Sequence, residues 1–203
     1  TLRHGGLVSY QQNADGLQSP YELNINYFDA LSDRKSSEPL ETQIDRFMAA
    51  QAIMLSIIGM PGIYFHSLFG SRGWPEGVPL TGRNRSINRQ KSDRVQIERE
   101  LGNRSSLRHQ VFDRYSQLLK ARSSSPAFDP HSAQRVIECG QAIFAVLRNE
   151  QVLCLHNIAN EQQTIPIDPN WQGAVNLIDG RSIAGNRNLE LGPYQVLWLK
   201  RND

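Results

Sequence analysis

Two short segments on either side of one long apolar segment constrain the fold most strongly. Residues 19–31 read SPYELNINYFDAL, in which apolar and polar side chains alternate after a Ser-Pro pair, as in an extended chain. Residues 60–71 begin with Met-Pro-Gly and continue with Ile63, Tyr64 and Phe65, an apolar run typical of a buried parallel strand. Residues 40–58 between them predict a helix that ends at Gly59. This order of extended segment, helix and strand indicates an α/β protein.

The remaining segments predict a hairpin, two further helices and a group of short strands. Leu7 to Tyr10 is a candidate strand, and the pair Asp15-Gly16 indicates a hairpin turn after it. Residues 93–101 and 107–122 predict helices, the second from a regular apolar stripe. After residue 134 turn residues separate short apolar runs, which predict a small antiparallel β domain. Its expected strands cover residues 136–139, 143–147, 152–156, 164–167, 174–177 and 194–199.

Three motifs in this order carry a family resemblance. They are YELNINYFDAL, then GMPGIYF, then GRNRSINR at residues 82–89. Together they resemble the sucrose phosphorylase branch of the alpha-amylase-type glycoside hydrolases, and the Ser-Pro-Tyr-Glu form is most similar to the glucosylglycerate phosphorylases. The resemblance runs from about Gly5 to Leu199. It implies the C-terminal part of a (β/α)8 barrel over residues 1–130, followed by an antiparallel β domain over residues 131–203.

The family members are more than twice as long as this chain, which begins Thr-Leu-Arg-His without an initiating methionine. We therefore expect a piece of a longer protein whose missing partner is the N-terminal part of the barrel. In the family, the nucleophile, the acid/base and a third carboxylate lie upstream of the stretch that matches Gly5. His4-Gly5-Gly6 is not the family's His-Asp-Gly motif, because it has no aspartate. None of the loop carboxylates falls in such a motif; these are Asp15, Glu22, Asp29, Asp33 and Glu76. The resemblance thus implies that this chain holds no catalytic carboxylate.

The implied reaction moves glucose from an α-glucoside to inorganic phosphate, which gives α-glucose 1-phosphate with retention through a glucosyl-enzyme intermediate. Glucosylglycerate, sucrose and sucrose 6-phosphate are the candidate donors. The family uses no metal or organic cofactor, so we expect none here. Two cysteines read as free thiols favour the reducing cytoplasm. A hydrolase or transglucosidase of the same family, with water or a sugar as acceptor, is the alternative within the enzyme class.

The implied binding residues of this chain are Tyr21, Glu22 and Arg89. Tyr21 and Glu22 lie where sucrose phosphorylases have a Tyr-Gln pair that faces the acceptor, and a glutamate there would repel an anion unless a cation pairs with it. Arg89 matches an arginine that meets phosphate or acceptor, which a guanidinium can hold through two hydrogen bonds. The structural alternatives are a packed aromatic for Tyr21, a solvated acid for Glu22 and a loop salt bridge for Arg89. Arg83 and Arg85 are weaker candidates.

Charge and composition leave two non-enzymatic alternatives. Residues 72–122 carry 12 Lys or Arg and 5 Asp or Glu, a local charge of +7, whereas the remainder carries −5. This basic region lacks the interleaved aromatic residues of nucleic-acid surfaces, so we expect no nucleic-acid partner. The terminal β domain suits a non-catalytic carbohydrate-binding module in outline, although its aromatic residues are few and Trp198 is expected in the core.

Other residue types exclude several site classes. Cys139 and Cys154 are expected to be free thiols, and no Cys-x-x-Cys or histidine cluster predicts a metal site. No uncharged apolar stretch is long enough for a membrane span. His66 is expected as a hydrogen-bonded residue at a loop rim. Trp74 is expected either to line a sugar site or to fix its Gly-Pro loop.

Overall fold

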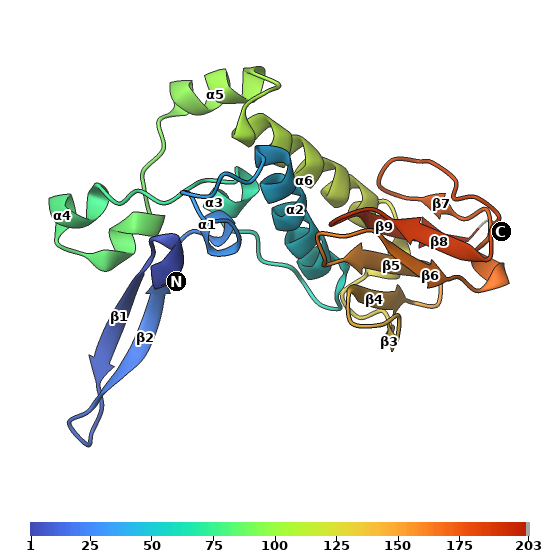
Figure 1. Cartoon of the computed structure of the whole chain (residues 1–203), viewed down its shortest axis with the longest axis horizontal. Coiled ribbons are helices and arrows are strands. Elements are labelled where there is room, and N and C mark those ends of the chain that lie inside the picture. Colours follow the sequence, from blue (N-terminus) through green and yellow to red (C-terminus); the bar gives the residue numbers. More distant parts are fainter. Residues whose placement is uncertain (202–203) are drawn as a thin grey trace. The chain divides into compact units, whose positions relative to one another are not determined.

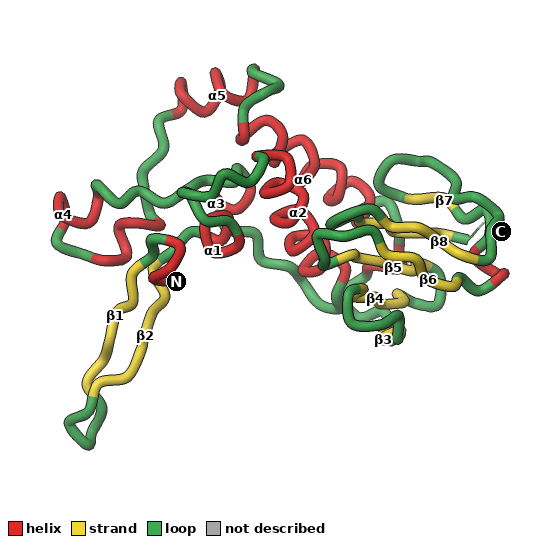
Figure 2. The backbone as a smooth tube through the Cα atoms, viewed as in Figure 1, coloured by secondary structure: helices red, strands yellow, loops and turns green. Residues whose placement is uncertain are grey.

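The computed structural model describes residues 1–201, and the chain forms two compact units (Figures 1 and 2). Unit 1 contains Thr1–Gln43 and Ile63–Phe112, and unit 2 contains Ile44–Gly62 and Asp113–Asp203. The two long helices, α2 (Leu40–Ser56) and α6 (Leu107–Ser123), each contribute residues to both units. Both helices agree with their predicted ranges to within two residues. The predicted division at residue 130 stays a prediction.

Unit 1 begins with the predicted hairpin. Strands β1 (Leu7–Gln12) and β2 (Gln18–Asn24) pair antiparallel, with a register shift between Ser9 and Tyr10. The turn depends on its residue types: Gly16 has a φ of 81°, and the Asp15 carboxylate accepts the backbone N–H of Leu17 at 2.9 Å. This confirms the hairpin and its turn.

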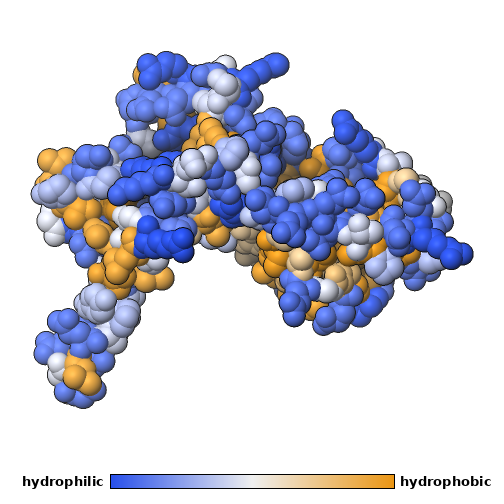
Figure 3. Space-filling model, in the orientation of Figure 1, coloured by the Kyte–Doolittle hydropathy of each residue, from blue (hydrophilic) through white to orange (hydrophobic). Residues whose placement is uncertain are grey.

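The rest of unit 1 consists of short helical segments joined by loops. Helix α5 (Arg94–Gly102) begins after Asp93, whose carboxylate accepts the backbone N–H of Gln96 at 2.8 Å and caps the helix. Figure 3 shows apolar side chains on the surface of this unit, and Leu23 and Leu80 are among the exposed ones. The segments are η1 (Leu2–His4), α1 (Tyr27–Leu31), α3 (Phe65–Leu68), α4 (Gly77–Thr81), η2 (Asn84–Asn88) and α5 (Arg94–Gly102).

Two expectations for this unit are wrong. Residues 63–65 form no strand; helix α3 begins at Phe65, and Tyr64 and Phe65 are about half exposed. A parallel strand needs a parallel neighbour for its hydrogen bonds, and every strand pairing within residues 1–201 is antiparallel. The extended segment at residues 19–31 also stops early. Strand β2 ends at Asn24, and α1 turns Phe28 and Asp29 into the interior.

Unit 2 is built on an antiparallel sheet in the order β3-β4-β5-β9-β7, and a separate pair, β6-β8, packs beside it. Six of these strands overlap the six predicted ones. The seventh, β8, was not predicted, because its sequence NLEL has only two apolar residues. The strands are β3 (Gln134–Ile137), β4 (Ile143–Arg148), β5 (Val152–Asn157), β6 (Gln163–Pro166), β7 (Val175–Asn176), β8 (Asn188–Leu191) and β9 (Val196–Lys200).

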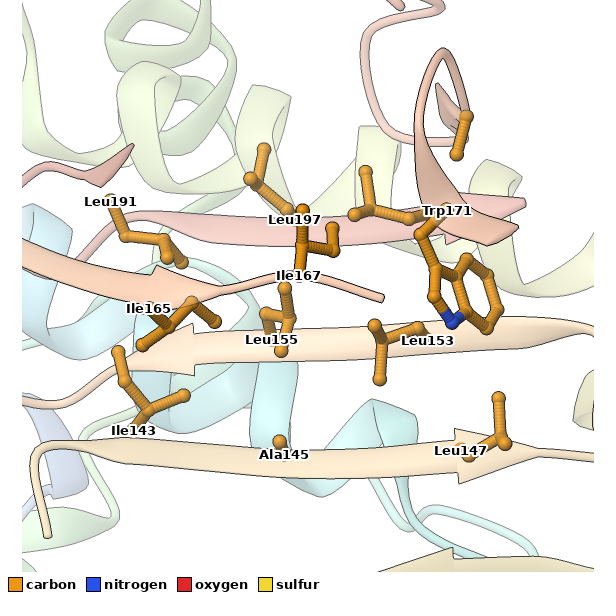
Figure 4. Packing of buried hydrophobic residues seen from close by; sticks show 12 residues of the cluster. Ile143, Ala145, Leu147, Leu153, Leu155, Ile165, Ile167, Trp171, Leu191 and Leu197 are labelled. Carbon is orange, nitrogen blue, oxygen red and sulfur yellow. The ribbon is translucent and has the colours of Figure 1, made fainter. Parts of the chain in front are cut away.

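The core of unit 2 follows from the alternation of side chains along the strands. Ala145 and Leu147 from β4 lie opposite Leu155 and Leu153 from β5, and all four turn to the same face (Figure 4). Leu197 and Leu199 of β9 extend this face within the sheet, and side chains from β6 and β8 cover it together with Trp171. Trp198 points to the other face and is fully buried, as predicted.

Two arginines complete the end of α2 within unit 2. Arg148 is fully buried and donates to the carbonyl oxygens of Ser56 and Asp129, both at 3.0 Å. Arg122 donates to the carbonyls of Leu55 and Gly59. The last carbonyls of a helix have no partner within it and carry partial negative charge, so guanidinium groups satisfy and stabilise them.

Candidate functional site

The candidate site lies in unit 1, where the hairpin meets the segment that carries the arginines. Glu22 on β2 is paired in register with Ser9 on β1. One carboxylate oxygen of Glu22 accepts a hydrogen bond from the Arg85 guanidinium at 3.2 Å, and the other lies 3.7 Å from the Arg89 guanidinium. The Glu22 side chain is 24% exposed, against 42% for Arg85 and 53% for Arg89. The Glu22 carboxylate is therefore the least exposed group of the three, and the two guanidinium groups face solvent.

The backbone of residues 82–89 is fixed by local contacts. Gly82 ends α4 with a φ of 66°, in the left-handed region that glycine adopts most easily. The Tyr64 hydroxyl donates to the carbonyl of Asn88 at 3.0 Å. The Trp74 N–H donates to the carbonyl of Ile87 at 2.6 Å. These two bonds hold the backbone at Ile87 and Asn88, between Arg85 and Arg89.

Residues 82–89 and the hairpin of β1 and β2 form the walls of an open cavity of about 350 Å³. Tyr21 and Glu22 line it from β2, and Arg83 and Arg85 line it from the other side, with Ser9 and Asn84 between them. The Asn84 amide donates to the Ser9 hydroxyl at 3.4 Å and links the two walls. The lining holds two arginines against one glutamate, and this excess of positive charge suits an anionic ligand.

The structure brings the three predicted residues together at this place. Glu22 and Arg89 form an ion pair, and Tyr21 lines the same cavity with its side chain 62% exposed. Glu22 thus has two cationic partners, Arg85 and Arg89. Sequence reasoning undervalued Arg85, which makes the shorter contact with Glu22. The signal was present in GRNRSINR, where Arg85 and Arg89 are four residues apart in a segment opened by glycine.

A buried carboxylate, Asp29, anchors the start of the loop that leads to the arginines. One of its oxygens accepts from the Arg72 guanidinium at 2.8 Å, and the other accepts the backbone N–H of Gly73 at 2.6 Å. Arg72 also donates to the Gln43 amide oxygen at 2.6 Å. Asp29 thus contributes to the shape of the loop and is surrounded by its own partners.

Two other residues considered in the sequence analysis, His66 and Trp74, have contacts that indicate structural roles. His66 is buried rather than at a rim, and burial, followed by the charge of Arg108, lowers its pKa. The Trp74 ring covers Gly77 so closely that a β-carbon there would lie 2.2 Å from it, so Trp74 fixes its own loop. Among residues 1–201 no group of three or more His, Cys, Asp or Glu side chains could hold a metal ion.

Comparison with characterised proteins gives consistent results. The chain is 42% identical to glucosylglycerate phosphorylase of Spirochaeta thermophila and 39% identical to that of Escherichia coli, over 96% and 98% of its length. It is 28% identical to sucrose phosphorylase of Agrobacterium vitis over 54% of its length. No family model matches. These matches confirm the resemblance to the sucrose phosphorylase branch of the alpha-amylase-type glycoside hydrolases. The chain spans only about a third of the two glucosylglycerate phosphorylases, 36% and 35% of their lengths.

Solved structures show the same fold family. AmyP in complex with maltotriose superimposes with a TM-score of 0.64 over 86% of this chain and 37% of that protein, at 15% identity. Trehalulose synthase MutB of Pseudomonas mesoacidophila gives a TM-score of 0.61 over 85% of this chain and 41% of that protein, at 18% identity. The chain therefore has the fold of the corresponding part of these two proteins. Within residues 1–201, no helix has the length and apolar character needed to cross a membrane.

Proposed function

We propose that this chain is the C-terminal portion of a retaining glycoside phosphorylase that transfers glucose from an α-glucoside to phosphate. The observation that carries the proposal is the contact of Glu22 with both Arg85 and Arg89, in a chain similar to glucosylglycerate phosphorylases along almost its whole length. We further propose that residues 1–130 belong to a (β/α)8 barrel, that residues 131–203 form its β domain, and that the enzyme is cytoplasmic and needs no metal or organic cofactor.

Arg89 and Arg85 bind the phosphate in this proposal. Phosphate carries negative charge that two guanidinium groups can neutralise through paired hydrogen bonds. Because Glu22 already lies against both groups, it fixes their positions and confines the anion to their outer side. Glu22 also binds the acceptor, because a carboxylate beside two cations can still accept hydrogen bonds from sugar or glycerate hydroxyls. The exposed aromatic ring of Tyr21 forms one wall of the cavity that Glu22 and Arg85 also line.

The reaction balances in two displacement steps. A carboxylate outside this chain attacks the anomeric carbon, and the glycosidic oxygen leaves with a proton from a second carboxyl group. A phosphate oxygen then attacks the same carbon and the carboxylate leaves, which gives α-glucose 1-phosphate. The residues of this chain make no covalent bond. They bind the attacking anion and hold it in position, which lowers the entropy cost of the second step.

The rival function is hydrolysis or transfer to a sugar, and phosphate dependence separates the two. The test uses a chimera in which this chain follows the N-terminal part of the Spirochaeta thermophila glucosylglycerate phosphorylase. The chimera is incubated with glucosylglycerate, sucrose or sucrose 6-phosphate, with and without phosphate. We expect glucose 1-phosphate that requires phosphate, formed fastest from glucosylglycerate. Free glucose released at the same rate without phosphate would identify a hydrolase, and the parent Spirochaeta enzyme serves as the control for assembly.

A further inference from the structure

We propose that unit 2 carries a separate binding site for a neutral sugar. The site is a cavity of about 470 Å³ between helices α2 and α6 and the loops that precede β9. Its size falls within the range of small-molecule pockets. Every residue that lines it belongs to unit 2, whereas the proposed phosphate site belongs to unit 1. This inference does not rest on the phosphorylase function.

The floor of the cavity is apolar and its rim is polar. Met48, Leu118 and Leu197 lie at the floor and are almost fully buried. Side chains from α6 and from the loops before β9 surround this floor, including Gln117 and Gln195, which are exposed. A pyranose ring has apolar C–H faces and hydroxyl groups around its edge, so an apolar floor with a hydrogen-bonding rim matches it.

The charged side chains of the lining sum to −1, because Arg114 is a cation and Asp45 and Asp179 are anions. Asp45 forms an ion pair with Arg114, and the Asp179 carboxylate accepts the Asn176 amide at 2.9 Å and the backbone N–H of Arg181 at 3.0 Å. Arg114 is the one basic side chain of the lining and it already has an acidic partner. A phosphate here would meet two carboxylates and one arginine that is already paired, whereas the hydroxyl groups of a neutral sugar can donate to the Asp179 carboxylate.

Two amides at the rim have unused hydrogen-bonding capacity. Gln117 donates to Asp113 at 2.8 Å, and within residues 1–201 its amide oxygen accepts nothing from the protein. The Gln195 amide oxygen accepts the backbone N–H of Gly192 at 2.8 Å. Within residues 1–201, the NH₂ group of Gln195 donates no hydrogen bond to the protein. The rim thus offers an acceptor and a donor, and a sugar hydroxyl can satisfy either.

Tyr194 supplies the observation that separates this cavity from an ordinary surface groove. Pro193 and Tyr194 are the central residues of a turn closed by the Gln195 N–H and the Gly192 carbonyl at 3.1 Å. Tyr194 has a φ of 53°, in the left-handed region where such turns normally place glycine. The Arg46 guanidinium lies 5.2 Å from the ring centre and donates to the hydroxyl at 3.1 Å. A strained backbone with a fixed aromatic ring at a cavity wall is typical of a binding site.

The experiment uses maltose as the probe and measures saturation transfer from the 203-residue chain to the sugar by NMR. We expect transfer to the maltose ring protons that phosphate does not reduce. Tyr194→Gly removes the ring and suits the positive φ, so the fold should be kept while the apparent affinity for maltose falls at least tenfold. Gln117→Ala should weaken binding in the same direction.

Two controls locate the site. Gln162→Ala changes an exposed glutamine of unit 2 outside the cavity and should leave the transfer unchanged. Glu22→Ala changes the candidate site of unit 1 and should also leave it unchanged. Absence of transfer at tens of millimolar maltose overturns the proposal, as does full transfer in the folded Tyr194→Gly variant. Loss of transfer in Glu22→Ala alone would assign maltose to unit 1 and would equally contradict a site in unit 2.

Discussion

The buried histidine of unit 2 should make its stability depend on pH. His156 is fully buried, and burial lowers its pKa from 6.5 to about 4, although the carbonyls of Phe144 and Ala52 act in the opposite direction. Its Nδ1 lies 3.0 Å from the Phe144 carbonyl, and its Nε2 accepts the indole N–H of Trp198 at 3.3 Å. Protonation of His156 Nε2 would place its N–H against the indole N–H of Trp198. The folded state therefore disfavours protonation of His156.

Whether stability rises or falls with pH depends on which state, folded or unfolded, binds the proton of His156 more strongly. The unfolded chain has a histidine pKa near 6.5, so between about pH 6.5 and pH 4 the unfolded state binds more protons. Stability is therefore complete above pH 6.5 and falls as the pH is lowered toward 4. At 1.36 kcal/mol per pKa unit, the free energy of unfolding should fall by about 2 kcal/mol between pH 7 and pH 5 on account of this residue alone.

The assay is urea unfolding followed by tryptophan fluorescence at pH 7, 6 and 5. His156→Gln keeps a hydrogen-bond donor and acceptor but cannot titrate in this range, so it should lose most of the pH dependence. His131→Gln changes an exposed histidine and should behave as the parent chain does. If the parent and His156→Gln lose the same free energy between pH 7 and pH 5, the buried histidine does not act as described.

Two further predictions concern the core and the missing chemistry. Tyr115→Phe should lower the free energy of unfolding by about 1–3 kcal/mol, because the buried Tyr115 hydroxyl donates to Gln51 at 2.6 Å and its loss leaves a buried acceptor. Adding Gln51→Met should recover part of that loss in a chemical denaturation series, whereas a purely additive result would contradict the role of this bond. The 203-residue chain alone should form no glucose 1-phosphate from glucosylglycerate and phosphate. Turnover that survives purification and depends on Asp15 or Glu22 would overturn that expectation.

Local patterns predicted most of the secondary structure, and the errors have physical causes. The apolar stripe of residues 107–122 and the Asp15-Gly16 turn are short-range signals, and both elements formed. The apolar run at residues 63–65 predicted a strand, but a strand depends on partners that are distant in sequence. Strand β8 alternates polar and apolar residues over only four positions, which is too short a pattern to indicate a strand, and it forms by pairing with β6. Propensity along the chain does not contain that information.

The site was predicted in part for the same reason. Tyr21, Glu22 and Arg89 were identified from motif resemblance, but the contact of Glu22 with two arginines depends on how β2 meets residues 82–89. Arg85 was given low weight, because in the sequence it does not differ from its neighbour Arg83. The cavity of unit 2 could not be predicted at all, since α2, α6 and the loops before β9 meet only in the folded chain.

The central claim, that Arg89 binds the phosphate, is tested most directly by the ratio of phosphorolysis to hydrolysis in the chimera. Arg89→Ala removes a charge-assisted contact that contributes about 1.5–3 kcal/mol, so kcat/KM for phosphate should fall by one to two orders of magnitude. Hydrolysis of the glucosyl-enzyme by water needs no such contact and should continue. Arg94→Ala, which removes a highly exposed arginine that pairs with Glu98 and not with Glu22, should leave the ratio unchanged. An equal fall in both activities in folded Arg89→Ala protein would contradict the phosphate role.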